Sequence, residues 1–545
     1  MDNNKRVILA VVLSAVILFG WQWLFPASHQ PAVQPEQQTA TTQGERGANA
    51  TGASQSAATQ SETAAPVNTV QLDEFTPGEG REVVVTTPLY TATFNTQGGI
   101  LEKYLLENYK ETIESGSPQV NMIGEEAQRK APLGLVVNGK ATWTDAQWSF
   151  DGGDLAIGPG ETKTVTFTGQ MGDLRVERHL TFTGDNYAIN ETVSVTNAGK
   201  IGLDGKIAFT AATRSLNTDG GRMNRDRFEF MTTEGKREEV TDHDKLEQWM
   251  SHTAPLDWAA ISSNYFLMAM VPGQQTSTIK ARIEDGIYRL ALERSATFPP
   301  MTQMNFDNVY FFGPTDRDLL AKVPGNLAKV VNFGWFDVIA KPLLLFMNWI
   351  YQYVGNYGVA ILLLTVVIKL LFWPLTHKSY KSMNEMKKLQ PLMQKIKEKH
   401  GDDKQKMQQE IMQLYKTYKV SPAGGCLPMV IQIPVFFGLY RALMGAVELR
   451  HACFIKYLPF TDHIWLADLS AKDPYYITPL IMGLTMFLQQ KLTPQAGDPM
   501  QQKLMLLMPV VFTFMFLNFP AGLVVYWLTN NVLSIGQQWM IMRKS

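Results

Sequence analysis

The feature that most constrains the fold of this 545-residue chain is an apolar run, residues 359–375, that contains a single charge, Lys369. Twelve Leu, Ile, Val or Phe side chains fill this run. Each favours insertion into a bilayer by about 0.3–0.6 kcal/mol, whereas a central lysine costs about 2.5–3.5 kcal/mol. The run is therefore predicted to span a membrane. Two interpretations of Lys369 are open: its side chain reaches the bilayer surface, or it faces a partner or a wet cavity.

Five other apolar runs make the chain an α-helical membrane protein with six predicted transmembrane helices. One lies at residues 7–25, directly after Lys5 and Arg6. It is expected to stay as an N-terminal anchor, residues 1–26, because a small-residue cleavage pattern is poor around Pro26. Several of the other runs are short for a 30 Å hydrocarbon core, which favours tilted helices or a thin bilayer. These runs lie near residues 427–446, 475–489, 504–517 and 521–540.

The segment between the N-terminal anchor and the later apolar runs, residues 27–324, has two parts. Residues 27–82 are rich in Gln, Ala, Thr, Ser and Gly, so they are predicted to be a disordered linker. Residues 83–324 contain short stretches of alternating apolar and polar residues, such as 162–168, which predict an all-β domain built as an antiparallel sandwich. The only cysteines, Cys426 and Cys453, lie outside this domain, so its core alone must hold it together.

The charge distribution predicts the orientation of the chain in the membrane. Residues 376–420 contain eleven lysines and five acidic residues, a net charge of +6, whereas the whole chain carries −1. Loops rich in lysine remain in the cytoplasm. Both termini are therefore predicted to be cytoplasmic, and the β domain is predicted to lie on the opposite side of the membrane.

The same basic segment, residues 377–420, is predicted to be a helical hairpin. Apolar residues recur every three or four positions on both sides of a turn at residues 401–403. Two interpretations are open for its lysines. The hairpin lies on anionic lipid headgroups, or it is a basic docking site for a ribosome, a targeting factor or a nascent chain.

Polar side chains within the predicted spans fall on particular helix faces. Thr365 and Lys369 are four residues apart and share one face. A second set of polar side chains forms a stripe along the last predicted span, residues 521–540. The third predicted span, residues 427–446, adds one side-chain amide. Such groups either bond neighbouring helices or, together with a cation, line a hydrated groove. The stripe comprises Trp527, either Asn530 or Asn531, Ser534 and Gln538, and the amide belongs to Gln432.

The residue types missing from the spans argue against several functions. No Asp, Glu or His lies in the interior of a predicted span, so a proton relay or a buried ion pair with Lys369 has no evident members. The sequence also contains no nucleophile motif, phosphate-binding loop or metal-ligand cluster. We therefore predict neither an enzyme nor a cofactor or metal site, and no direct nucleic-acid partner.

Seven stretches of the sequence resemble the YidC family of bacterial membrane protein insertases, in the long form that carries a periplasmic domain. The resemblance covers nearly the whole chain. The stretches are residues 310–314 (YFFGP), 355–374, 401–410 (GDDKQKMQQE), 415–434 (YKTYKVSPAGGCLPMVIQIP), 473–476 (DPYY), 498–503 (DPMQQK) and 519–538.

The resemblance implies a fold and a function for the whole chain. It implies a periplasmic β-supersandwich and a five-span insertase core at residues 357–545. Between them, the amphipathic pattern around residues 335–350 predicts an interfacial segment at residues 325–356. Such a protein inserts and folds integral proteins in the bacterial inner membrane, alone or with the Sec translocon. The implied partners are nascent membrane proteins, the Sec translocon, the ribosome, the signal recognition particle receptor and the lipid bilayer.

The resemblance also implies site residues. Lys369 occupies the position of an intramembrane arginine that lines a hydrophilic groove open to cytoplasm and lipid; lysine keeps the charge but lacks the planar, two-pronged donor of arginine. Thr365, Gln432 and Trp527 match further groove positions. The implied substrate-contacting residues are Leu427, Pro428, Ile433, Pro434 and Phe436.

Two other functions remain open from the sequence. A transporter or channel with a carbohydrate-binding periplasmic domain would need a sealed pathway and a coupling acid, and the spans lack that acid. A scaffold that only docks a translocon would share the predicted topology.

Overall fold

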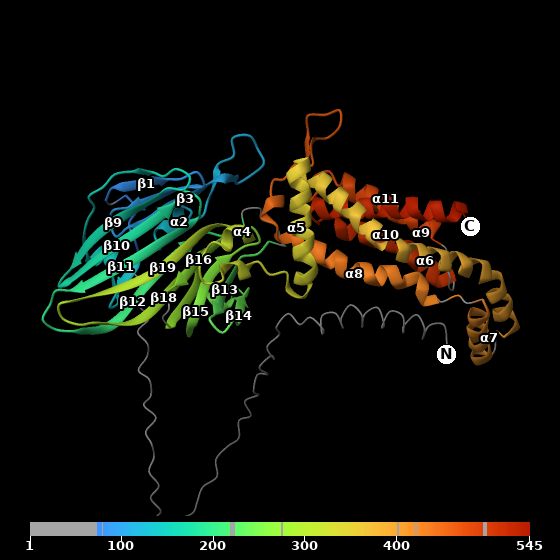
Figure 1. The fold of residues 1–545 in the computed structure, drawn as a ribbon, viewed down its shortest axis with the longest axis horizontal. Coiled ribbons are helices and arrows are strands. Elements are labelled where there is room, and N and C mark those ends of the chain that lie inside the picture. The colour runs from blue at the N-terminus through green and yellow to red at the C-terminus, as the bar shows by residue number, and fades with distance from the viewer. Residues whose placement is uncertain are drawn as a thin grey trace, which may run out of the picture. The chain divides into compact units, whose positions relative to one another are not determined.

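The computed structural model describes residues 74–544 except 79, 218–223, 243, 274–275, 401–402, 419, 421 and 494–498. The predicted anchor, residues 1–26, and most of the predicted linker, residues 27–82, lie outside this range. Strands come first along the described chain and long helices follow (Figure 1).

The β domain contains two sheets. The smaller has the strand order β4 (Gln119–Asn121), β3 (Ile100–Lys110), β2 (Tyr90–Asn95), β1 (Glu82–Thr86) and β8 (Leu155–Ala156). The larger has the order β6 (Lys140–Ala141), β5 (Leu135–Val137), β12 (Leu203–Thr213), β18 (Ile287–Phe298), β17 (Thr276–Glu284), β15 (Met250–Ser262), β16 (Phe266–Pro272), β19 (Thr302–Pro314), β11 (Ala188–Asn197), β10 (Leu174–Thr183), β9 (Thr162–Met171) and β7 (Gln147–Ser149). Strands β13 (Arg227–Thr232) and β14 (Arg237–Val240) join it at β15.

The alternating pattern of the sequence explains these strands. In β10, every second residue is buried, from Leu174 to Phe182, and the residues between them are more exposed. Leu180 pairs with Glu191 on β11 and with Val165 on β9, so its sheet neighbours are antiparallel. The predicted β-rich sandwich is confirmed. It is not purely β, because two one-turn helices interrupt it, α2 (Glu125–Gln128) and α3 (Thr142–Asp145).

Phe75, which precedes the predicted start of the domain at residue 83, packs against the domain. Phe75 is buried beside Ile100 and Trp143, and its backbone N–H donates to the carbonyl oxygen of Arg129 at 2.9 Å. An isolated aromatic residue at the end of a polar tract was therefore a sign of the domain edge.

A fully buried ion pair joins β10 and β11, two neighbouring strands of the larger sheet. The Arg178 guanidinium donates to the Glu191 carboxylate at 2.7 Å and to the Leu133 carbonyl at 2.7 Å. The Tyr310 hydroxyl donates to the second Glu191 oxygen at 2.7 Å. Such a pair is stable in the interior only when its remaining polar atoms are also bonded, as they are here.

Short helices connect the β domain to the helical region. The long helices of that region were predicted from the sequence. The connectors are α4 (Arg317–Leu320), η2 (Leu327–Val330) and η3 (Gly334–Phe336), and the remaining short elements are η1 (Asp244–Leu246), η4 (Val447–Leu449), β20 (Ile455–Tyr457) and β21 (Ile464–Leu466). The long helices are α5 (Asp337–Val354), α6 (Tyr357–Lys399), α7 (Lys404–Thr417), α8 (Pro422–Gly445), α9 (Ile477–Leu492), α10 (Pro499–Phe516) and α11 (Ala521–Lys544). Helix α11 packs against α6 and α9, and α8 packs against α5 and α6.

The outer surface of these helices is apolar. Leu371 on α6 is 73% exposed, and Leu484 on α9 and Phe514 on α10 are each 68% exposed. Exposing many large apolar side chains to water is unfavourable, whereas exposing them to lipid is not. Among the described helices, α6 alone is long and apolar enough by itself to cross a membrane, and α8 and α10 contain shorter apolar segments. The predicted helical region is thus confirmed, but the number of six spans is not.

Helix α5 forms within the predicted amphipathic segment, residues 325–356. It runs across the direction of α8 and α11 (Figure 1). Ala340, Met347 and Ile350 are buried against the other helices, while Val338 and Tyr353 are largely exposed. This one-sided burial is typical of a helix that lies along an apolar surface.

The loop after α8 contacts the β domain. The Arg450 guanidinium donates to the carbonyl oxygens of Lys110 at 2.8 Å and Glu111 at 3.0 Å, and it lies over the Phe266 ring. Nearby, the Asn348 amide donates to the Glu448 carboxylate at 3.2 Å. Burial, reinforced by the negative charge of Asp316, raises the pKa of Glu448 above its ordinary value.

We expect Glu448→Gln to raise the Tm of the full chain by about 2–4 °C at neutral pH. Because the pKa of Glu448 is higher in the folded chain than in the unfolded chain, Glu448 contributes fully to stability only at pH values below its unfolded pKa. That contribution is lost as the pH rises through its pKa in the folded chain. Glutamine does not ionise, so the variant keeps this stability at neutral pH. Melting in detergent across a pH series should show a gain that disappears at acidic pH, and the exposed Glu114→Gln should show none. A gain of equal size at every pH would contradict the assignment.

Candidate functional site

Lys369 lies in the interior of the helical region, and its amino group contacts α11. The residue is 9% exposed, and Nζ donates to the Ser534 hydroxyl at 2.7 Å. Ser534 in turn donates to the Asn530 carbonyl at 2.7 Å. Within the described residues, no carboxylate lies within ion-pair distance of Nζ. The cation is therefore held by neutral oxygen rather than neutralised by an acid.

A second polar contact reaches the same turn of α11 from α8. The Gln432 amide donates to the Asn530 side-chain oxygen at 2.7 Å. Asn530 and Ser534 are four residues apart, so they share one face of α11. The structure thus brings together four of the predicted groove residues, Lys369, Gln432, Asn530 and Ser534, from three helices.

The position of this contact bears on the two interpretations of Lys369. One to two turns further along α6, toward the basic hairpin, the buried amide of Gln537 donates to the Thr376 hydroxyl at 2.7 Å. A lysine side chain that extended to the end of the bundle would pass this pair. The Lys369 amino group instead bonds Ser534, which favours an interior charge.

Two other predicted groove residues bond partners other than Lys369 and Gln432. The Thr365 hydroxyl donates to the Ile361 carbonyl of its own helix at 2.6 Å. The Asn531 amide lies 3.4 Å from the Thr485 hydroxyl on α9. Consecutive residues point about 100° apart on a helix, so Asn530 and Asn531 cannot share one face.

Trp527 belongs to an aromatic cluster rather than to the polar contacts. Its ring centroid lies 4.7 Å from that of Phe436 on α8 and 5.3 Å from that of Phe516 on α10. The cluster therefore packs α8, α10 and α11 together. The role of Trp527 as a groove residue stays a prediction.

The predicted substrate-contacting residues lie on α8. Ile433 is exposed, and Pro434 and Phe436 are half-buried. The side chains of Leu427 and Pro428 lie outside the described part of the chain. Among Ile433, Pro434 and Phe436, whose side chains the structure describes, Ile433 offers the most accessible apolar surface.

Two buried residues beside the site were missed by sequence reasoning, Thr376 and Gln537. Gln537 is three residues after Ser534, and Thr376 is seven after Lys369, so both continue stripes that were already recognised. Gln538, which was recognised, instead lies 3.5 Å from the Thr493 hydroxyl beyond α9. Extending the helical spacing by one turn from Ser534 and by two turns from Lys369 would have found the pair.

The basic segment adjoins this site. The end of α6 and α7 pack through Met386 and Leu389, with Leu414 and Tyr415 alongside. His400 lies 2.9 Å from the Glu410 carboxylate near the turn between the two helices. A lysine-rich helix pair thus continues directly from the helix that carries Lys369.

This arrangement can attract an anion but offers little for bond chemistry. Lys369 is a point charge in a largely apolar setting, where electrostatic attraction is stronger than in water. Its neighbours are amides and hydroxyls, which can donate to a polar chain. In the described part of the chain, no group of three or more His, Cys, Asp or Glu is placed to hold a metal ion.

Comparison with known proteins identifies the family. The family model described as "60Kd inner membrane protein" matches residues 349–545, and the model described as "YidC periplasmic domain" matches residues 82–346. The membrane protein insertase YidC of Maridesulfovibrio salexigens is 53% identical, with 99% of each chain covered. The membrane protein insertase YidC of Nitratidesulfovibrio vulgaris is 51% identical, with 100% of each chain covered.

A solved structure of an active YidC insertase is also similar. It is 20% identical, with 85% of this chain and 93% of that chain covered, at a TM-score of 0.35. At that score the assignment rests on the sequence relatives, and these give no support to the transporter or channel alternative. The chain belongs to the YidC family of membrane protein insertases.

Proposed function

We propose that this chain inserts and folds integral membrane proteins, and that substrates enter through the polar site around Lys369. One observation carries the proposal: a buried cation, held by Ser534 and with no acid within ion-pair distance in the described structure, beside the Gln432 and Asn530 contact. A charge kept in a membrane helix without an acid to neutralise it is available to an incoming anionic group.

The proposed mechanism has two steps. First, the short polar and often acidic tail of a substrate enters the groove and is attracted by Lys369, because the local dielectric is lower than that of water. This shortens the apolar distance that the tail must cross. Second, the substrate's apolar helix moves along α8 and α10 into lipid, where each large apolar residue contributes about 0.3–0.6 kcal/mol. Hydrophobic transfer then drives insertion without ATP.

The proposed topology has six spans, with both termini in the cytoplasm and the β domain in the periplasm. The lysine-rich segment, residues 377–420, supports this orientation. The apolar outer surfaces of α6, α9 and α10 support contact with lipid. In this topology the hairpin faces the ribosome and the signal recognition particle receptor, and the insertase core works in the inner membrane alone or beside the Sec translocon.

The proposal is tested with the purified full chain in liposomes. A small single-span protein with an acidic N-terminal tail is added, and its protection from external protease is measured. We expect clear protection relative to liposomes without the chain. Equal protection in both preparations would overturn the insertase proposal.

A further inference from the structure

A pocket of about 550 Å³ lies where the β domain meets the helical region. Its β-domain wall comes from the start of β13, from β14 and from the loop before β13. Its other wall comes from the segment before α5 and from the last turns of α8. Four arginines and one acidic residue line it: Arg225, Arg227, Arg237, Arg441 and Glu239.

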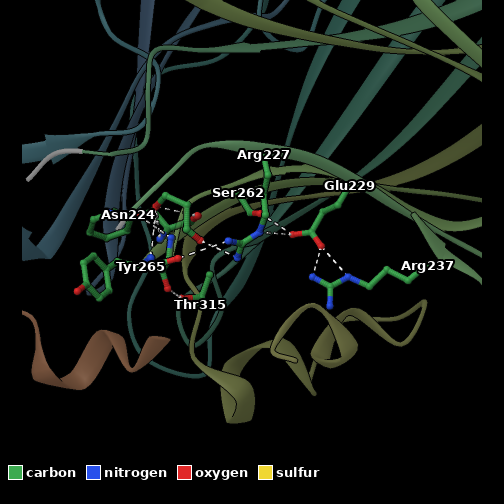
Figure 2. A network of polar contacts seen from close by, with 10 residues as sticks. Asn224, Arg227, Glu229, Arg237, Ser262, Tyr265 and Thr315 are labelled. Carbon is green, nitrogen blue, oxygen red and sulfur yellow. Dashed lines mark hydrogen bonds and ion pairs between the residues drawn. The ribbon is translucent and has the colours of Figure 1, made fainter. Parts of the chain in front are cut away.

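The charge of this pocket is positive. Behind the arginines, Glu229 is fully buried and lies between two of them (Figure 2). Its carboxylate accepts from Arg237 Nε at 2.8 Å and lies 3.6 Å from Arg227 Nε. One carboxylate cannot neutralise two guanidinium groups. Counting Glu229 and Glu239 against the four lining arginines leaves a net charge of about +2.

The inner arginines are held in place before any ligand arrives. Arg227 donates to the Asn264 side-chain oxygen at 3.4 Å and to the Ser263 carbonyl at 3.3 Å. The Ser262 hydroxyl donates to Glu229 at 2.5 Å and so fixes the carboxylate that orients both arginines (Figure 2). Because these contacts already fix Arg227 and Arg237, the two side chains lose little conformational entropy when an anion binds.

In the topology proposed above, in which α8 spans the bilayer, the end of α8 places the pocket at the level of the membrane surface. Met444 and Gly445 end α8, and Arg441 is exposed one turn before that end. One turn further into the helix, the Phe437 and Phe336 rings stack with their centroids 5.5 Å apart. Only helices and closed barrels cross a bilayer, so the β domain lies outside the hydrocarbon. The pocket is therefore polar at its β-domain wall and adjoins apolar helix surface.

We propose that this pocket binds the phosphate group of an anionic phospholipid headgroup. Arginine presents several donors in a planar fork that matches phosphate oxygens, and basic pockets beside membrane helices bind lipid headgroups. The adjoining apolar surface of α8 provides a path for acyl chains, which free inorganic phosphate would not use. Such a lipid would seat the β domain on the membrane.

The test uses the full chain with phosphatidylglycerol. Arg225 and Arg441 are changed together, Arg225→Gln and Arg441→Gln, because both are exposed, whereas removing Arg227 or Arg237 would leave Glu229 buried and underpaired. The matched control is Arg129→Gln, an exposed arginine of the β domain outside the pocket. Native mass spectrometry after mild delipidation measures the phosphatidylglycerol retained per chain.

We expect the double variant to retain about tenfold less phosphatidylglycerol than the native chain, and the control to match the native chain. A second arm measures Tm with added inorganic phosphate. Stabilisation of the native chain but not of the double variant, with equal lipid retention, would assign the phosphate to solution rather than to lipid. If neither lipid retention nor Tm distinguishes the double variant from the control, the proposal is overturned. Melting in phosphatidylcholine alone verifies that the double variant folds.

Discussion

Replacing Lys369 by alanine should reduce insertion of a single-span substrate with an acidic N-terminal tail by about tenfold. The same change should affect a substrate with a neutral tail much less. The reason is that Lys369 Nζ, which bonds Ser534, carries the charge of this site, and alanine removes that charge while the amides of Gln432 and Asn530 remain. Protease protection in liposomes, with the two substrates matched in their apolar segment, measures the difference.

Two control variants separate the effect of the Lys369 charge on the substrate tail from the effect of water in the site. Ser534→Ala removes the hydroxyl that holds Nζ but keeps the cation, so it should leave the preference for acidic tails in place. Lys369→Arg keeps the charge and should behave similarly, because a role as a point charge does not need the geometry of a particular donor. If Lys369→Ala impaired acidic and neutral tails equally, the site would act by admitting water rather than by attracting charge.

The second large effect concerns the close approach of α9 and α10. A Cβ atom at Gly483 would lie 1.9 Å from the Thr513 hydroxyl oxygen and 3.1 Å from Thr513 Cβ. Small residues let membrane helices approach in this way, and overpacking typically costs about 1–3 kcal/mol. Gly483→Leu should therefore separate α9 from α10 and greatly reduce the yield of monodisperse chain in detergent, measured by size-exclusion chromatography.

The chain contains a matched control for this change. A Cβ atom at Gly536 on α11 would meet no heavy atom within 4 Å. Gly536→Leu should therefore give a normal yield and a Tm near that of the native chain. Equal loss from both variants would show that leucine is harmful in these helices for a reason other than the contact with Thr513.

The β domain and the helices could be predicted from sequence because their signals are local. Alternation over residues 162–168 predicted β9, and the apolar run at 359–375 predicted the centre of α6. The continuity of α6 could not be predicted. It runs unbroken to Lys399 although Pro374 and Pro391 lie inside it. A proline often ends a helix, and only packing with neighbouring elements decides when it does not.

The candidate site was predicted in part for a similar reason. Helical spacing placed Asn530 and Ser534 on one face, but it could not show which neighbouring helix that face meets. Packing decides the rotation of α11, which turns Asn531 toward α9 and places Trp527 among aromatic rings. The arginine pocket left no pattern in the sequence, because Arg225 and Arg441 lie far apart along the chain and meet only in the folded structure.

A charge exchange between the chain and its substrate tests the central claim most directly. Lys369→Glu is combined with a substrate whose acidic tail residues are replaced by lysine, and insertion into liposomes is measured for all four pairings of chain and tail. Attraction at the groove predicts that the variant inserts the basic-tailed substrate better than the acidic-tailed one, opposite to the native chain. If the variant kept the native preference, or if tail charge made no difference to either chain, Lys369 would not receive substrates by its charge.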